Sequence, residues 1–312
     1  MTIRNALFTV LLLAVASWGA AETPVPATTG PTLEATYPSL SPGPLRQARL
    51  VDLPAGMILR AGGFVVTEAL LASRLAEAGD DTPLRRSLDR NGPFVVEKMT
   101  REALLGAEAR AWAQTTSLPP GNEDPSRLVE AYLKSVGAQA KVAPEETKAY
   151  LDAHQETYGG RDAEQAAADV REYLLWEKQA AVREAYVSSL SERTPVEFSA
   201  AWLRTHAPLA LDNPVDRARR SGKPSLVDFG GGGCGSCDPM TPLLQDLTRW
   251  YAQQCSFVFV SVSEDPLLAE RYGVQMAPVQ LFFNAQGQEV YRHLGVFARS
   301  GVMARLAEIG VK

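Results

Sequence analysis

Apolar positions along the chain follow two different patterns, which meet near residue 200. Between residues 49 and 200 they recur three and four positions apart, as in Leu70, Leu71 and Leu75, which places apolar side chains on one face of a helix. Residues suited to beginning or ending such helices are Thr67, Asp124, Gly137, Pro144, Gly159 and Asp162. The pattern predicts a mainly α-helical N-terminal domain over residues 49–200.

Residues 201–312 instead alternate short apolar runs with helical segments, a pattern typical of α/β domains. The expected elements are, in order, a short helix at 213–222, a strand at 226–229, a helix ending at Gln253, a strand at 257–262, a helix around 267–272, strands at 279–284 and 288–294, and a final helix carrying Val302, Leu306 and Ile309. This part of the chain is predicted to form a second, C-terminal domain.

The first residues have the pattern of a secretory signal peptide. Arg4 precedes an apolar run from Ala6 to Val15, and small residues follow it up to Ala21. The alternative is an uncleaved membrane anchor, but the run is shorter than the roughly 20 apolar residues that a membrane span needs. We therefore predict a signal peptide at 1–21, secretion across the inner membrane to the periplasm, and a Pro-rich flexible segment at 22–48.

Composition limits the classes of function. The 312 residues carry a formal net charge of -5, which gives no reason to expect a nucleic-acid partner, and the basic run around Arg219 is read as a solvated helix face. Histidines and cysteines are too few and too scattered for a structural metal site, and no cofactor is expected. The glycines from Gly230 onward are not a phosphate-binding loop, because Ser236 stands where that motif requires lysine.

The residue pair with the clearest chemistry is Cys234 and Cys237, which follow an apolar strand and a run of four glycines. Two sulfurs at this spacing can form a disulfide if a helix begins at the first cysteine. The N-terminus of that helix favours a thiolate, so Cys234 is the candidate nucleophile. A permanently closed structural disulfide is the alternative. The third cysteine, Cys255, opens an apolar strand and is read as a buried small hydrophobe.

Seven residues, the two cysteines among them, recur in an order and spacing typical of one family: Asp228, Cys234, Cys237, Pro242, Ala277, Pro278 and Gly295. On these residues, about the last hundred positions of the chain resemble the thioredoxin superfamily. The resemblance implies an α/β domain with a central mixed sheet, in which the buried carboxylate of Asp228 takes the proton of the second cysteine. It further implies a cis-proline at Pro278, peptide pairing at the backbone of Ala277, and close substrate approach at Gly295.

Two departures from that family affect the expected site. Gly230 and Gly233 replace the flanking tryptophans, so a more open and less apolar rim is expected, with Gly233 still lining the substrate site. No lysine partner for Asp228 stands in the strand at 257–262. The Gly-Ser dipeptide between the cysteines leaves the redox direction open.

The helical domain resembles the N-terminal domain of SurA-type periplasmic chaperones. Residues 59–67 are similar to their opening strand, turn and helix start, and residues 141–150 are similar to the helix before their prolyl-isomerase insertion. Residues 158–161 leave no room for such an insertion. This resemblance implies binding of client chains, and the alternative is a helical spacer or dimerisation domain.

Together these features predict an exported enzyme, a thiol-disulfide oxidoreductase acting on protein thiols or disulfides, whose helical domain holds clients or partners. As a reductant, it would need a membrane redox partner. Two alternatives stay open, namely a chaperone or binding module with a non-catalytic thioredoxin fold, and a copper(I) carrier that uses both cysteines.

Overall fold

A computed structural model describes residues 30–40, 45–116, 124–231 and 240–312. The described residues form two compact units: those up to Met99 together with those from Val196 to Lys312, and those between Thr100 and Pro195. These units do not follow the predicted boundary at residue 200, because strands from both ends of the predicted helical domain pair with each other. The predicted signal peptide lies outside the described residues.

The described part of the Pro-rich segment is folded, so the prediction of a flexible tether is wrong there. It contains helix α1 (Leu33–Thr36), in which the N-cap hydroxyl of Thr32 accepts a hydrogen bond from the amide of Ala35. Leu33, Leu40 and Leu45 are buried. The prolines limit regular structure here, but the leucines between them are packed into the first unit.

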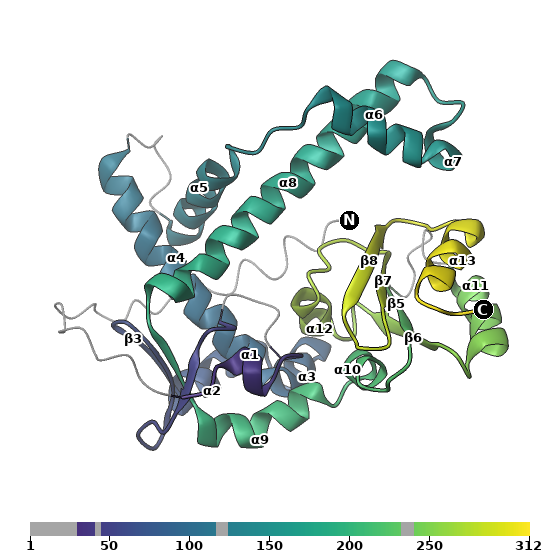
Figure 1. The fold of residues 1–312 in the computed structure, drawn as a ribbon. Coiled ribbons are helices and arrows are strands. Elements are labelled where there is room, and N and C mark those ends of the chain that lie inside the picture. The colour runs from purple at the N-terminus through teal and green to yellow at the C-terminus, as the bar shows by residue number, and fades with distance from the viewer. Residues whose placement is uncertain (1–29, 41–44, 117–123, 232–239) are drawn as a thin grey trace. The chain divides into compact units, whose positions relative to one another are not determined.

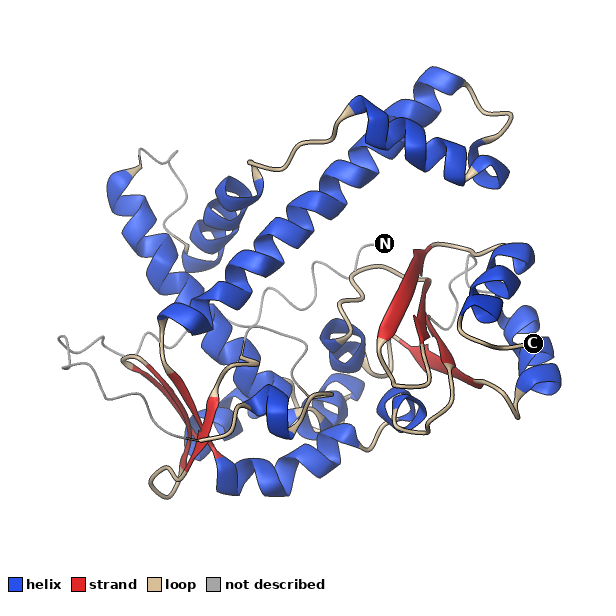
Figure 2. Ribbon diagram, in the orientation of Figure 1, coloured by secondary structure: helices blue, strands red, loops and turns tan. Residues whose placement is uncertain are grey.

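The first unit begins with a small sheet (Figure 2). Its strands are β1 (Arg49–Val51), β2 (Met57–Ala61), β3 (Phe64–Thr67) and β4 (Val196–Ser199), in the order β1-β4-β2-β3. β4 pairs parallel with β1 and antiparallel with β2. The expected strand, turn and helix start at 59–67 are present, and Thr67 caps the next helix by accepting from the amide of Leu70.

The helical part of the chain matches the predicted pattern. Its helices are α2 (Glu68–Ala76), α3 (Pro83–Arg90), α4 (Gly92–Thr115), α5 (Pro125–Gly137), α6 (Pro144–Ala153), α7 (Gln155–Tyr158) and α8 (Ala163–Arg193). Asp124 and Asp162 cap α5 and α8 by accepting backbone hydrogen bonds. Within the second unit, α5 and α6 pack along α8 (Figure 1).

From α10 onward the C-terminal region has the predicted α/β order. These elements are α10 (Pro214–Arg219), β5 (Ser225–Gly230), α11 (Met240–Tyr251), β6 (Ser256–Ser261), α12 (Pro266–Arg271), β7 (Val279–Phe283), β8 (Glu289–Leu294) and α13 (Arg299–Glu308). Before them lies α9 (Ala200–Leu211), a helix that was not predicted. The sheet order is β6-β5-β7-β8. It is mixed, because β5 and β6 are parallel whereas β7 is antiparallel to both of its neighbours.

Alternation along the strands gives this sheet two apolar faces. Val227 and Phe229 pack with residues of α10 and α12, whereas Leu226 packs with residues of α11 and α13. Asp228 follows the alternation and belongs to the same face as Leu226. The helices that cover the two faces can be followed in Figure 1.

Polar contacts join the N-terminal helices of the first unit to α12. Asp265, the N-cap of α12, accepts from the hydroxyl of Ser87 and from Arg90 Nη2 at 3.0 Å. Lys98 Nζ lies 2.8 Å from Glu270 Oε2. The part of the predicted helical region up to Met99 thus belongs to one compact unit with the α/β region, whereas Thr100–Pro195 form the other unit. Along the described ranges, no helix combines the length and apolar character that crossing a bilayer requires.

Candidate active site

Three residues of the predicted site, Gly233, Cys234 and Cys237, lie outside the described residues. The described part of the site comprises Asp228 at the centre of the C-terminal sheet, the loop carrying Ala277 and Pro278, and Gly295 after β8. These come from separate elements, and the sheet brings the first two into neighbouring positions.

Asp228 is a fully buried carboxyl on the central strand β5. The strand register places it beside Phe259 on β6 and Gln280 on β7. Gln280 Nε2 donates a hydrogen bond of 2.8 Å to Asp228 Oδ1, while Oδ2 has no hydrogen-bond partner among the described residues. Burial raises the pKa of Asp228 above its usual range, and the hydrogen bond from Gln280 opposes that shift.

Gln280 is a site residue that the sequence reasoning missed. It lies in β7, where its neighbours Val279, Leu281, Phe282 and Phe283 are apolar and the whole strand is buried. A lone amide in such a strand needs a hydrogen-bond partner, which was the available signal. The partner itself could not be read from the sequence, because it depends on the register between β5 and β7.

Phe259 occupies the strand position that faces Asp228 from β6, where no lysine was found. A Cβ atom at Gly230 would stand 2.8 Å from Phe259 Cε2 and 3.7 Å from Asp228 Oδ2. Glycine at position 230 therefore leaves space for the aromatic ring to lie against the strand, close to the carboxyl. The ring remains 51% exposed.

The expectation of a more open and less apolar rim stays a prediction, because Gly233 and the two cysteines lie outside the described residues. Phe259 lies where a side chain of residue 230 would extend, and Met276 and Val296 are also exposed. The loops that carry Met276 and Val296 are joined by a hydrogen bond of 2.9 Å from the amide of Gly295 to the carbonyl of Pro278. Phe259, Met276 and Val296 are thus exposed apolar side chains on or next to the described elements that carry Asp228, Pro278 and Gly295.

The Ala277-Pro278 peptide bond is cis, as the resemblance implied. Gly295 has φ +95°, and nothing lies within 4 Å of the position that its Cβ would take. Its backbone conformation alone thus favours glycine. The substrate roles expected for Ala277, Pro278 and Gly295 stay predictions.

The third cysteine is separate from this site. Cys255 is a buried free thiol in the core between β5, α11 and α13, and burial raises its pKa to about 12. This environment agrees with the structural role predicted for it. No group of three or more potential metal ligands occurs within the described ranges of the chain.

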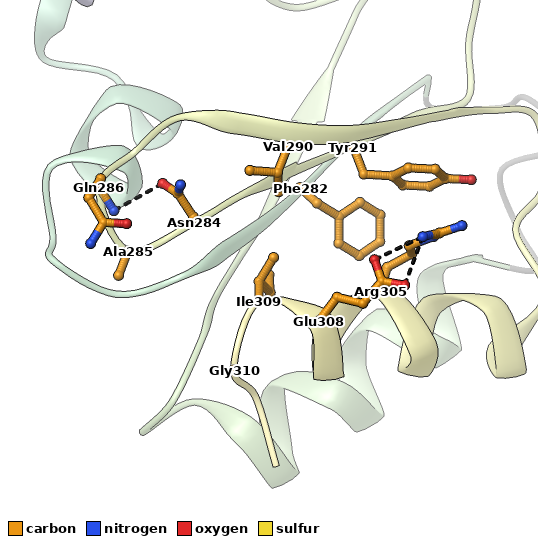
Figure 3. A pocket seen from close by; sticks show the side chains of 10 residues that line it. All are labelled: Phe282, Asn284, Ala285, Gln286, Val290, Tyr291, Arg305, Glu308, Ile309 and Gly310. Carbon is orange, nitrogen blue, oxygen red and sulfur yellow. Dashed lines mark hydrogen bonds and ion pairs between the residues drawn. The ribbon is translucent and has the colours of Figure 1, made fainter.

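Figure 3 shows a cavity of about 540 Å³ beside β7, β8 and α13. It lies toward the end of β7, whereas the register places Asp228 beside Gln280 near the start of that strand. The lining residues of the cavity are Phe282, Asn284, Ala285, Gln286, Val290, Tyr291, Arg305, Glu308, Ile309 and Gly310. Arg305 Nη1 and Glu308 Oε1, its charged groups, pair with each other at 2.8 Å. Nothing in this lining adds to the chemistry of the Asp228 region.

The sheet, the helices on both faces, the buried carboxyl on the central strand and the cis-proline before β7 define a thioredoxin fold. The thioredoxin family model matches residues 210–308. A thioredoxin-like protein of Synechocystis sp. is 38% identical over 76 residues, covering 24% of this chain and 71% of the relative. The chain belongs to the thioredoxin family through this region.

Two further comparisons are with thioredoxins. Thioredoxin from Alicyclobacillus acidocaldarius is 28% identical over 98 residues, which cover 31% of this chain and 92% of that protein. The crystal structure of Fasciola hepatica thioredoxin is 25% identical, covers 28% of this chain and 81% of its own, and has a TM-score of 0.26. The family model and the two sequence relatives support assignment of the C-terminal region to the thiol-disulfide oxidoreductase class.

Proposed function

We propose that this protein is an exported thiol-disulfide oxidoreductase that acts on protein thiols or disulfides through Cys234 and Cys237. The observation that carries the proposal is the Cys-x-x-Cys pair in a thioredoxin domain, a few glycines after the strand that holds the buried carboxyl of Asp228. Such a carboxyl can accept the proton that a buried thiol must lose before it attacks.

In the reducing direction, the Cys234 thiolate attacks a substrate disulfide and forms a mixed disulfide, while one substrate sulfur leaves and takes up a proton. Cys237 then loses its proton to Asp228 and attacks the Cys234 sulfur, which releases the second substrate thiolate. The substrate gains two electrons and the cysteine pair becomes a disulfide. A membrane redox partner would supply the next two electrons. The oxidising direction reverses these steps.

Export and client binding form the second half of the proposal. The apolar run at 6–15 and the small residues up to Ala21 support a cleaved signal peptide. The resemblance of residues 59–67 and 141–150 to SurA-type chaperones supports client or partner binding by the helical region. N-terminal sequencing of the protein from a periplasmic extract tests export, with Glu22 expected as the first residue. Recovery of the uncleaved chain only from the cytoplasm would contradict it.

Disulfide exchange with the mature chain tests the chemistry. Reduction of insulin by dithiothreitol should be accelerated by the native protein, abolished by Cys234→Ser, and unchanged by the control Cys255→Ser. Cys237→Ser should accumulate a mixed disulfide with the substrate. A Cys234→Ser protein with native exchange activity would overturn the mechanism. Suppression of client aggregation that requires neither sulfur would instead support a binding module.

The direction of electron flow requires the reduction potential of the Cys234-Cys237 pair. A value near about -270 mV, as in thioredoxin, would support a reductant fed by a membrane partner. A value near about -120 mV would support donation of disulfides to exported chains. Copper bound stoichiometrically through both sulfurs would favour a carrier over either enzyme.

A further inference from the structure

The hydrogen bond between Gln280 and Asp228 makes the two oxygens of the carboxyl unequal. Oδ1 accepts from Gln280 Nε2 at 2.8 Å, and both side chains are fully buried. Oδ2 lies 3.7 Å from the position of a Cβ at Gly230, the last residue of β5. The oxygen without a described partner is therefore close to the strand end from which the chain continues toward the two cysteines.

Rotation of the Asp228 side chain would exchange the two oxygens, and the site limits that rotation on two sides. Gln280 lies beside Asp228 in the β5–β7 register, and Phe259 lies beside it in the β5–β6 register. An amide donor fixed in a buried strand holds one carboxyl oxygen in place, because breaking the bond would leave two buried polar groups unpaired.

We propose that Gln280 is a positioning residue that holds Asp228 Oδ1 and leaves Oδ2 as the oxygen that exchanges a proton. This inference rests on the proposed function. In the resolving step, the Cys237 thiol proton moves to Oδ2, the Cys234–Cys237 disulfide forms, and the bond from Cys234 to the substrate sulfur breaks. The substrate sulfur leaves with the bond's electron pair and takes up a proton from water.

Among the described neighbours of the Asp228 carboxyl, few groups other than Gln280 can affect its pKa or its orientation. In the described part of the sheet, its strand neighbours Phe259 and Gln280 carry no charge, and beyond Gln280 the register places His293 on β8. The described parts of α11 and α13 pack on this face through apolar residues, including Leu244 and Leu306. A change at position 280 should therefore act on Asp228 directly.

The test compares Gln280→Met, which keeps the chain length and removes the donor, with Leu281→Met as the control. Leu281 is buried one position further along β7 and belongs to the opposite face of the sheet. We expect Gln280→Met to slow release of substrate from a preformed mixed disulfide by roughly tenfold at pH 7, part of the 10²–10⁴-fold that a positioned general base contributes. Leu281→Met should retain the native rate.

The pH profile separates positioning from mere loss of packing. Loss of the donor disfavours the carboxylate, so the midpoint of the release rate should move to higher pH in Gln280→Met. The double variant Asp228→Asn, Gln280→Met should be no slower than Asp228→Asn alone, because both changes affect one proton transfer. A native pH profile in Gln280→Met, or independent losses in the double variant, would overturn the inference.

A thiol-independent readout distinguishes this inference from the proposed function. Carbon-13 NMR titration of the Asp228 carboxyl in the full mature chain should show an upward pKa shift on Gln280→Met. An active enzyme whose carboxyl titration is unchanged by that substitution would refute the role of Gln280 alone. A native chain that exchanges no disulfide at all would refute the proposed function, and with it the proton transfer, even where the titration shifts.

Discussion

The buried ion pair between Arg271 and Asp216 offers a direct test of how the first unit is held together. Arg271 Nη1 lies 2.9 Å from Asp216 Oδ2, and the side chains are 1% and 0% exposed. Arg271 also donates to the carbonyls of Ala210 and Ser39. One guanidinium on α12 therefore joins α10, the end of α9 and the N-terminal segment.

The substitution Arg271→Met should lower the free energy of unfolding by about 3 kcal/mol, the lower end of the 3–5 kcal/mol typical of breaking a buried pair. The lower end applies because Asp216 keeps two close donors, the Tyr272 hydroxyl at 2.7 Å and Asn213 Nδ2 at 2.5 Å. Arg219 also remains 3.6 Å from Asp216. The loss corresponds to a melting temperature lower by roughly 6–12 °C.

Denaturant unfolding followed by tryptophan fluorescence measures the effect, with Arg217→Met as the matched control. Arg217 and Asp212 form an exposed pair, 56% and 72% accessible, so the control should change stability by less than about 1 kcal/mol. Adding Asp216→Asn to Arg271→Met removes the uncompensated charge and should recover part of the loss. A loss below about 1 kcal/mol for Arg271→Met, or no recovery in the double variant, would refute the reasoning.

Three further predictions concern single residues. Gly287→Ala should lower the free energy of unfolding by about 2–4 kcal/mol, because φ is +73° and the new Cβ would lie 2.4 Å from the carbonyl oxygen of Arg219. The control Gly310→Ala, at φ +91° but with open space around the new Cβ, should lower it by only about 1–2 kcal/mol in the same unfolding assay. Asp228→Asn should stabilise the protein at pH 7 but not near pH 3. The pKa of Asp228 is higher in the native state than its value of about 3.9 in the unfolded chain. The native protein therefore loses stability as the pH rises from about 3.9 to the native pKa, because only the unfolded chain ionises readily in that range. Denaturation midpoints at both pH values check this, and equal gains would contradict it. Finally, burial raises the pKa of Cys255 to about 12, so this thiol should react slowly with iodoacetamide at pH 8. In a Cys234→Ser, Cys237→Ser protein, mass spectrometry should detect labelling only after denaturant is added. Rapid labelling of the native chain would disprove the burial of Cys255.

The order of the C-terminal elements from α10 onward could be predicted from the sequence, because local spacing of apolar residues and caps or turns mark them. Asn213 caps α10 and Asp265 caps α12 through bonds to residues three positions away. These caps depend on residues that are close together in the chain. The role of Asp228 and the cis bond before Pro278 were instead expected from the resemblance to the thioredoxin superfamily.

The N-terminal region shows where local patterns were insufficient. β4 pairs with β1 and β2 across more than a hundred intervening residues, so no local spacing could connect Phe198 with Leu50 or Leu59. Leu33 and Leu45 were assigned to a flexible segment because prolines surround them. Whether an isolated leucine is buried depends on the surface that the rest of the fold presents to it.

The sequence by itself determined the thiol motif, the carboxyl on the strand before it and the class of fold, since these follow from residue type and short-range spacing. Only the tertiary structure decided which groups surround that carboxyl. Gln280 reaches Asp228 across 52 residues, and Phe259 lies against Gly230 because two strands pair in one register. A shift of one residue would turn these side chains to the other face of the sheet. Strand register therefore sets the chemistry of the site.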